Sequence, residues 1–282
     1  MRTGTPFLVN LACTGVIPTR AMSAQVPLTH SEIVADVGRA LEAGVQMVHL
    51  HARDAAGVQT ADPEPYGRMI EDIRALPGGR ELVVCVTTSG RLDSGFDSRA
   101  RVLDLDGKAR PDMASLTLGS LNFMQSASIN QPDTIRRLAK RMQARGIRPE
   151  LEVFDLGMAN FARVLLAESL VTAPLYVNVL LGNVAGAQAD PLQLAAILAA
   201  LPPGCVVCVA GLGRFQLPAN GLGLLLADGV RTGLEDNLWL DAQRTRPASN
   251  AALIERVVSA AALFERSLMP RSQARQLLGL KA

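Results

Sequence analysis

The 282-residue chain has few aromatic residues, three histidines and no block of like charge. Aromatic residues make up 4% of it, and 28 lysines and arginines against 26 aspartates and glutamates give a formal net charge of +2. Nucleic-acid binding needs clustered positive charge and stacking side chains, so this composition argues against a nucleic-acid partner. No apolar run reaches the ~20 residues of a membrane span without a glycine, proline or charged residue inside it. We therefore expect a soluble, cytoplasmic protein with no membrane partner.

Cysteine is also scarce, and its four copies lie in apolar segments typical of buried strands, as expected of a reducing compartment. Cys205 and Cys208 form a CxxC pattern. A spacing of three residues on a strand puts the two thiols on opposite faces, which argues against a redox or zinc site there. The sequence predicts inert core thiols.

Short runs rich in valine, leucine and isoleucine alternate with segments of helical periodicity, the pattern of repeated βα units on a parallel sheet. Eight such runs are the strand number of a (β/α)8 TIM barrel, which typically uses ~250 residues. We predict an α/β protein with a single TIM-barrel domain over residues 1–282. The irregular segment 91–112 is predicted to be a functional loop. The predicted strands are 7–15, 45–53, 81–90, 113–123, 148–155, 175–182, 205–213 and 229–236, and the clearest helices are 29–44, 63–79, 133–146, 158–170 and 190–201.

Polar residues recur with a spacing of two near the ends of these strands, so they share the inward face of the barrel. Such clusters at strand C-termini predict an active site at that mouth. His49 and His51 share one face of the second strand, and two histidines with a carboxylate form a common catalytic zinc set. The alternative is a pair of barrel-lining histidines bonded to their neighbours. His30 precedes a helix start and is interpreted as a surface or capping residue.

Six segments together resemble the β-keto acid cleavage enzymes, typified by the 3-keto-5-aminohexanoate cleavage enzyme. The resemblance implies a zinc-bound barrel, usually a homotetramer. Its reaction converts a β-keto acid and acetyl-CoA into acetoacetate and a new acyl-CoA through an enolate and a retro-Claisen step. The segments are the Thr14–Gly15 turn, VHLHARD at 48–54, LGSLNF at 118–123, PELEVFD at 149–155, AGLGRFQLP at 210–218 and RTGLEDN at 231–237.

The resemblance also implies roles for individual residues. His49, His51 and Glu235 match the metal ligands, and Asp236 with Arg231 matches the catalytic acid/base pair. Glu152 matches a supporting carboxylate, and Thr87 is a further catalytic candidate that stands where the typical member has serine. In an ideal strand Asp236 points away from Glu235, so it reaches the site only if the chain has already turned. An ordinary ion pair with Arg231 is the alternative.

The remaining candidates concern the two substrates. Ile17 stands where the typical member carries a glutamate that faces a substrate ammonium, so we expect a substrate without a positively charged tail. Barrel phosphate sites often form after the last strands, which makes Gly211, Gly213 and Arg214 candidates for a CoA phosphate. A tight turn explains the same glycines equally well. The predicted substrate-binding residues are Thr14, Ile17, Ser89, Gly90, Ser115 and Thr117.

Two other functions stay open at this point. One is a metal-dependent barrel aldolase or hydrolase that acts on a chelating keto acid without CoA. The other is a metal-free barrel that binds a metabolite as a regulator.

Overall fold

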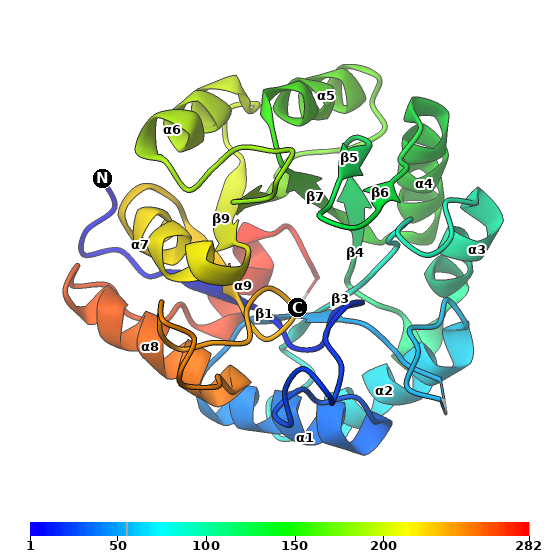
Figure 1. Ribbon diagram of the computed structural model, residues 1–282. Coiled ribbons are helices and arrows are strands. Elements are labelled where there is room, and N and C mark those ends of the chain that lie inside the picture. Colours follow the sequence, from blue (N-terminus) through cyan, green and yellow to red (C-terminus); the bar gives the residue numbers. More distant parts are fainter. Residues whose placement is uncertain (55, 282) are drawn as a thin grey trace.

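The computed structural model describes residues 1–54 and 56–281 of the chain, and its strands form a closed parallel barrel ringed by helices (Figure 1). The strands follow one another around the barrel in the order β1-β10-β9-β8-β7-β4-β3-β2. Each of the eight predicted segments contains one of them, so the predicted TIM barrel is confirmed. The strands are β1 (Leu8–Ala12), β2 (Met47–Leu50), β3 (Val83–Val86), β4 (Met113–Thr117), β7 (Arg148–Val153), β8 (Tyr176–Leu181), β9 (Val206–Gly211) and β10 (Gly229–Thr232).

The five clearest predicted helices are also confirmed, as α1, α2, α4, α5 and α6. α1 begins after a capping box, in which the Thr29 side chain accepts from the Glu32 amide and Glu32 accepts from the Thr29 amide. His30 follows, and its imidazole lies 2.7 Å from Asp72 on the surface, as predicted. The helices are α1 (His30–Glu42), α2 (Pro63–Ala75), α3 (Phe96–Ala100), α4 (Pro132–Arg145), α5 (Leu156–Ala167), α6 (Pro191–Ala200), α7 (Gln216–Leu226), α8 (Asn250–Ala262) and α9 (Arg271–Leu277), with 3-10 turns η1 (Arg101–Asp104), η2 (Gly107–Ala109) and η3 (Gly213–Phe215).

The fourth predicted strand, 113–123, is longer than the strand in the structure. β4 ends at Thr117, and the chain then forms a small antiparallel hairpin of β5 (Leu121–Asn122) and β6 (Ala127–Ser128), closed by a bond from the Phe123 amide to the Ser126 carbonyl of 2.8 Å. A two-residue strand carries too little periodicity to be seen in a sequence. The segment 91–112 holds α3, η1 and η2, and no helix of the described residues is long and apolar enough to cross a membrane.

Alternate residues of the barrel strands enter two different cores. Val9 and Val48 join the large cluster between the strands and the helices. Leu8 and Met47 join a second cluster, which fills the barrel interior at the N-terminal ends of the strands. Cys208 belongs to this second cluster and Cys205 packs against the first, so the two thiols of the CxxC pattern are on opposite sides as predicted. Because this second cluster fills the N-terminal half of the barrel interior, the space inside the barrel in the described residues lies at the C-terminal ends of the strands.

Two glycines of α7 provide a test of the close packing between this helix and the barrel. A Cβ on Gly223 would lie 2.9 Å from the Gly229 carbonyl oxygen and 3.0 Å from Val230, whereas a Cβ on Gly221 would meet nothing within 4 Å. We expect Gly223→Ala to lower the free energy of unfolding by about 1–3 kcal/mol through overpacking. Gly221→Ala should raise it by about 0.5–1 kcal/mol because alanine loses less backbone entropy in a helix. Urea unfolding of both variants checks the sign, and equal effects would contradict the packing described.

Candidate active site

A cavity of about 890 Å³ opens at the C-terminal ends of the strands. Its walls include most of the residues that the sequence singled out, which come from the ends of β2, β3, β4, β7, β9 and β10 and from the loop after β1. The predicted site residues that line it are Ile17, His49, His51, Thr87, Ser89, Thr117, Glu152, Gly213, Arg214, Arg231, Glu235 and Asp236.

Three potential metal ligands converge in this cavity. His49 Nε2 and His51 Nε2 lie 3.1 Å apart, and Glu235 Oε1 lies 3.3 Å from His51 Nε2. One donor atom from each residue falls within 4.8 Å of the others. Glu235 Oε2 is buried and has no hydrogen-bond partner among the described residues, so this carboxylate has unused binding capacity. Two nitrogens and an oxygen with an open position suit a zinc-class ion, so the donor set fits the metal that the family resemblance implies.

Two glycines let Glu235 and Asp236 reach this position. Gly15 has φ +73°, and a Cβ there would lie 2.5 Å from Glu235 Cγ. Gly233 has φ +143°, and a Cβ there would overlap the Ala12 carbonyl oxygen. The Gly233 carbonyl accepts from the Asp236 amide at 3.2 Å, so the chain turns immediately after β10. This turn gives Asp236 access to the cavity, as the sequence argument required.

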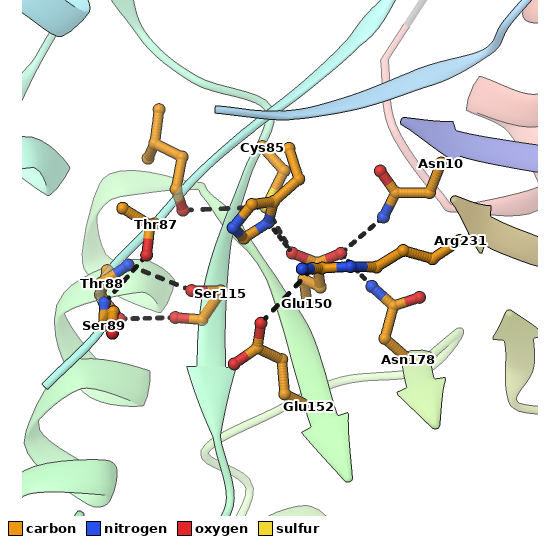
Figure 2. A network of polar contacts seen from close by, with 12 residues as sticks. Asn10, Cys85, Thr87, Thr88, Ser89, Ser115, Glu150, Glu152, Asn178 and Arg231 are labelled. Carbon is orange, nitrogen blue, oxygen red and sulfur yellow. Dashed lines mark hydrogen bonds and ion pairs between the residues drawn. The ribbon is translucent and has the colours of Figure 1, made fainter. Parts of the chain in front are cut away.

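Glu150 holds His49 in place from below. One oxygen lies 2.6 Å from His49 Nδ1 and 3.0 Å from the Cys85 thiol, and the other accepts from the Asn10 and Asn178 amides (Figure 2). Burial by itself raises the pKa of Glu150, but the His49 imidazole and Arg231 together lower it to about 2. A neutral His49 that donates from Nδ1 to this carboxylate has its Nε2 lone pair free for a metal ion on the side of His51.

The motif resemblance implies a role for Glu152 but not for Glu150, which lies two residues earlier on β7 and therefore on the same inward face. A carboxylate that orients a ligating histidine is common, and the inward Glu150 together with the His-x-His pattern was the available signal. His49, Cys85 and Glu150 also form a group close enough for a metal. However, the Glu150 oxygens already accept four hydrogen bonds, and burial, followed by the Glu150 charge, raises the pKa of Cys85 well above its usual value. This second group is therefore a hydrogen-bond network.

Arg231 is the cation at the centre of the site and is 1% exposed. Its Nε lies 2.9 Å from Asp236 Oδ2 and its Nη2 lies 3.2 Å from Asp236 Oδ1, which makes a bidentate pair. Nη2 also lies 2.8 Å from Glu235 Oε1, and Glu152 Oε1 is 3.7 Å from Nη1 (Figure 2). One guanidinium thus faces three carboxylates, with Glu150 beneath them, and this excess of negative charge favours a bound cation.

Two of these carboxylates hold protons more readily than exposed ones. Burial raises the pKa of Asp236 and of Glu152, although Arg231 opposes the shift in both. Glu152 accepts a hydrogen bond of 2.6 Å from the Thr117 hydroxyl, so both predicted residues are joined in one contact. Thr87 accepts from the Ser89 amide at 3.0 Å, which leaves its hydroxyl proton available to the cavity.

Four predicted residues do not line the cavity. Thr14 donates to the Pro27 carbonyl at 3.0 Å, and Ser115 Oγ accepts from the Thr88 amide at 3.1 Å (Figure 2). Both hydroxyls tie loops to the barrel. Gly90 and Gly211 are packed too closely against neighbouring chain to carry a side chain. None of these four residues is among those that line the cavity, so their contact with a substrate stays a prediction.

The predicted phosphate site needs a correction. The Gly213 amide donates to the Asp236 carbonyl at 2.7 Å and therefore has no hydrogen left for a phosphate. Arg214 lines the cavity from an exposed position, and so does Arg244, which the sequence argument missed because it lies outside the matched motifs. Arg244 Nη2 comes within 3.9 Å of the place that a Cβ on Gly213 would occupy. Positive charge, rather than glycine amides, is what this rim offers to an anion.

The chain matches the family described as beta-keto acid cleavage enzyme over residues 6–280. It belongs to that family. The resemblance of the six segments to the β-keto acid cleavage enzymes is thereby confirmed.

Two relatives align along almost the entire chain. It is 37% identical over 278 residues to the 3-oxoadipate:acetyl-CoA acetyltransferase of Cupriavidus necator, covering 98% of this chain and 95% of the relative. It is 31% identical over 276 residues to the 3-keto-5-aminohexanoate cleavage enzyme of Fusobacterium nucleatum, covering 98% of both. The apo structure of ObcA superposes with a TM-score of 0.81 at 20% identity, over 92% of this chain and 66% of that one, and supports the fold.

The role of Glu150 can be tested on metal affinity. Glu150→Gln keeps the shape but replaces one of the two acceptor oxygens by an NH2 donor and removes the negative charge beside His49 Nδ1, so we expect metal affinity to fall about 10–100-fold, as is typical when such partners are removed. Competition with a chelator measures this. Glu64→Gln, on the exposed face of α2, is the control, and His51→Ala gives the reference for loss of a ligand. Parental affinity in Glu150→Gln would show that the contact does not orient the histidine.

Proposed function

We propose that this protein is a metal-dependent enzyme that condenses a β-keto acid with acetyl-CoA to give acetoacetate and the CoA thioester of the remaining fragment. The observation that carries the proposal is the placement of the His49, His51 and Glu235 donors directly beside the Arg231–Asp236 pair in one wide cavity. Acetyl-CoA appears in the name of the Cupriavidus relative, which supports it as the second substrate.

In this proposal, His49, His51 and Glu235 hold the ion. A divalent cation held there would supply positive charge that makes the carbon between the carboxylate and the ketone of a β-keto acid more acidic. Asp236 accepts the proton from that carbon, and burial suits it to the task because it raises the carboxyl pKa. Arg231 positions Asp236 by its two hydrogen bonds, and Glu152 is the supporting carboxylate.

The later steps of the proposed reaction conserve every atom and proton of the two substrates. The deprotonated carbon of the β-keto acid forms a bond to the thioester carbon of acetyl-CoA. The bond between this thioester carbon and the CoA sulfur breaks, and the CoA thiolate adds to the ketone carbon of the substrate. The bond between the ketone carbon and the former acidic carbon breaks, which releases the new thioester. Acetoacetate regains the proton from Asp236. Thr87 has a hydroxyl proton available to donate to a substrate oxygen during these steps.

The finer features belong to the same proposal. Zinc suits two imidazoles and a carboxylate with an open position. Arg214 and Arg244 are suited to the CoA phosphates because both line the rim beside η3. The homotetramer rests on family resemblance alone and is tested by light scattering, and location in the cytoplasm stays a prediction.

The proposed reaction can be tested with acetyl-CoA that carries ¹³C in its acetyl group. Incubation with a panel of β-keto acids should move the label into acetoacetate and produce an unlabelled new thioester, both read by mass spectrometry. Cleavage of the keto acid without any new thioester would favour the aldolase or hydrolase alternative. Binding without turnover in metal-loaded protein would favour a regulator.

Asp236→Asn separates catalysis from structure. The amide keeps the shape of the side chain but cannot accept the proton, so we expect kcat per bound metal to fall by about 10²–10⁴-fold. A thermal melt and metal analysis accompany the assay. If the variant turned over at nearly the parental rate per metal, Asp236 would be a structural ion-pair partner and Glu152 the next candidate for the base.

A further inference from the structure

The cavity wall carries an arginine that the proposed chemistry does not use. Arg91 follows Thr87 and Ser89 at a spacing of two residues, and all three line the cavity. It lies at the start of the irregular segment 91–112. Its side chain makes no hydrogen bond or ion pair with any described residue, and its Nε is buried without a partner. A guanidinium that is half-buried and unpaired inside a cavity is a binding site for an anion.

Arg91 is held rigidly in place. Its guanidinium stacks 3.9 Å from the centre of the Phe123 ring, which in turn meets Phe154 edge-on at 6.0 Å. The loop that carries it is pinned by Arg99, whose Nε donates to the Thr88 carbonyl at 2.7 Å. Stacking leaves the edge of the guanidinium available, so its donors are preorganised for a carboxylate.

The unpaired cations of the cavity fall on opposite walls. Arg214 and Arg244 lie beside η3, directly after β9, whereas Arg91 follows β3. β3 and β9 are separated by three strands in either direction around the barrel. An anion at Arg91 is therefore a different group from the phosphates suited to the β9 rim.

The acidic residues of the cavity are concentrated around Arg231, although the charge of Glu235 also reaches Arg91, where burial lowers the pKa of the guanidinium and Glu235 opposes this shift. The carboxylates in its described lining are Glu152, Glu235 and Asp236, and each lies within 3.7 Å of Arg231. Ile17, which is 46% exposed, and Arg91 also line the cavity, from the segments after β1 and β3. An ammonium beside either residue would find no carboxylate in the described lining that is not already paired with Arg231.

We infer that Arg91 binds a second carboxylate at the far end of the β-keto acid, and that it selects dicarboxylic substrates over neutral and ammonium-bearing ones. The inference rests on the proposed function and adds the substrate class to it. 3-Oxoadipate, in the name of the Cupriavidus relative, has this chemistry, since its distal carboxylate follows the ketone by two methylene carbons. The β-keto carboxylate sits by the His49 and His51 donors, and the distal one lies against Arg91.

Three acids and four proteins test the inference. The acids are 3-oxoadipate, its distal half-amide of nearly the same shape, and 3-keto-5-aminohexanoate. The proteins are the parent, Arg91→Met, Arg91→Lys, and the control Arg68→Met, which changes an exposed arginine paired with Glu64 on α2. Two readouts are taken on metal-loaded protein: kcat/KM with acetyl-CoA, and the affinity for each acid by calorimetric titration.

For the parent protein, we expect 3-oxoadipate to have the highest affinity and kcat/KM of the three acids, and 3-keto-5-aminohexanoate the lowest. Arg91→Met should lower both values for 3-oxoadipate by about 10–100-fold while changing those for the half-amide by less than about threefold, since a charge-assisted pair is lost only with the diacid. Arg91→Lys should recover part of the loss because it keeps the charge without the bidentate fork. KM for acetyl-CoA and the values of Arg68→Met should match the parent.

Equal losses for the diacid and the half-amide, or no loss for the diacid, would overturn the inference. The titration keeps it separate from the proposed function. If no acid gave a new thioester but diacid binding still depended on Arg91, the acyl transfer would be wrong and the anion site would stand. If transfer proceeded without any dependence on Arg91, the reverse would hold.

Discussion

The buried charge cluster around Arg231 is the interaction on which the rest of the site depends. One guanidinium is surrounded by Glu152, Glu235 and Asp236, with Glu150 below them. Removing this many carboxylates from water costs free energy that a single cation cannot offset, so the cluster needs either protons or a second positive charge. Burial raises the pKa of Glu152 and of Asp236, and the unpartnered Oε2 of Glu235 is where we propose that a divalent ion supplies the second positive charge.

The barrel supplies the rigidity that such a cluster requires. The charged groups come from two strands, Glu150 and Glu152 from β7 and Arg231 from β10, and the packed N-terminal half of the barrel fixes the distance between these strands. Glu235 and Asp236 lie beyond the last strand, so their position depends on the turn at Gly233 and on the room left by Gly15. The reactive groups therefore sit on a framework that cannot shift without breaking the strand ladder.

The fold and most of the cavity followed from patterns within single segments. The eight apolar runs predicted the barrel, and a spacing of two placed His49, His51 and Arg231 on its inner face. What the sequence could not provide was the identity of partners from distant segments. Thr14 and Ser115 are as polar as Thr87, yet they bond to neighbouring loops instead of facing the cavity. Arg91 is one of several arginines in an irregular segment, and nothing in the sequence predicts its contact with Phe123. This contact depends on the β5–β6 hairpin, whose two-residue strands are too short to predict.

We propose that His49, His51 and Glu235 hold a divalent metal beside Arg231. Anomalous diffraction from crystals of the metal-loaded protein, collected on both sides of the zinc absorption edge, tests it most directly, because the structure contains a second group of potential ligands only one imidazole away. We expect a single strong peak between His49 Nε2, His51 Nε2 and the Glu235 carboxylate. A peak between Cys85 and Glu150, or a stoichiometric metal with no density at the histidine pair, would contradict it.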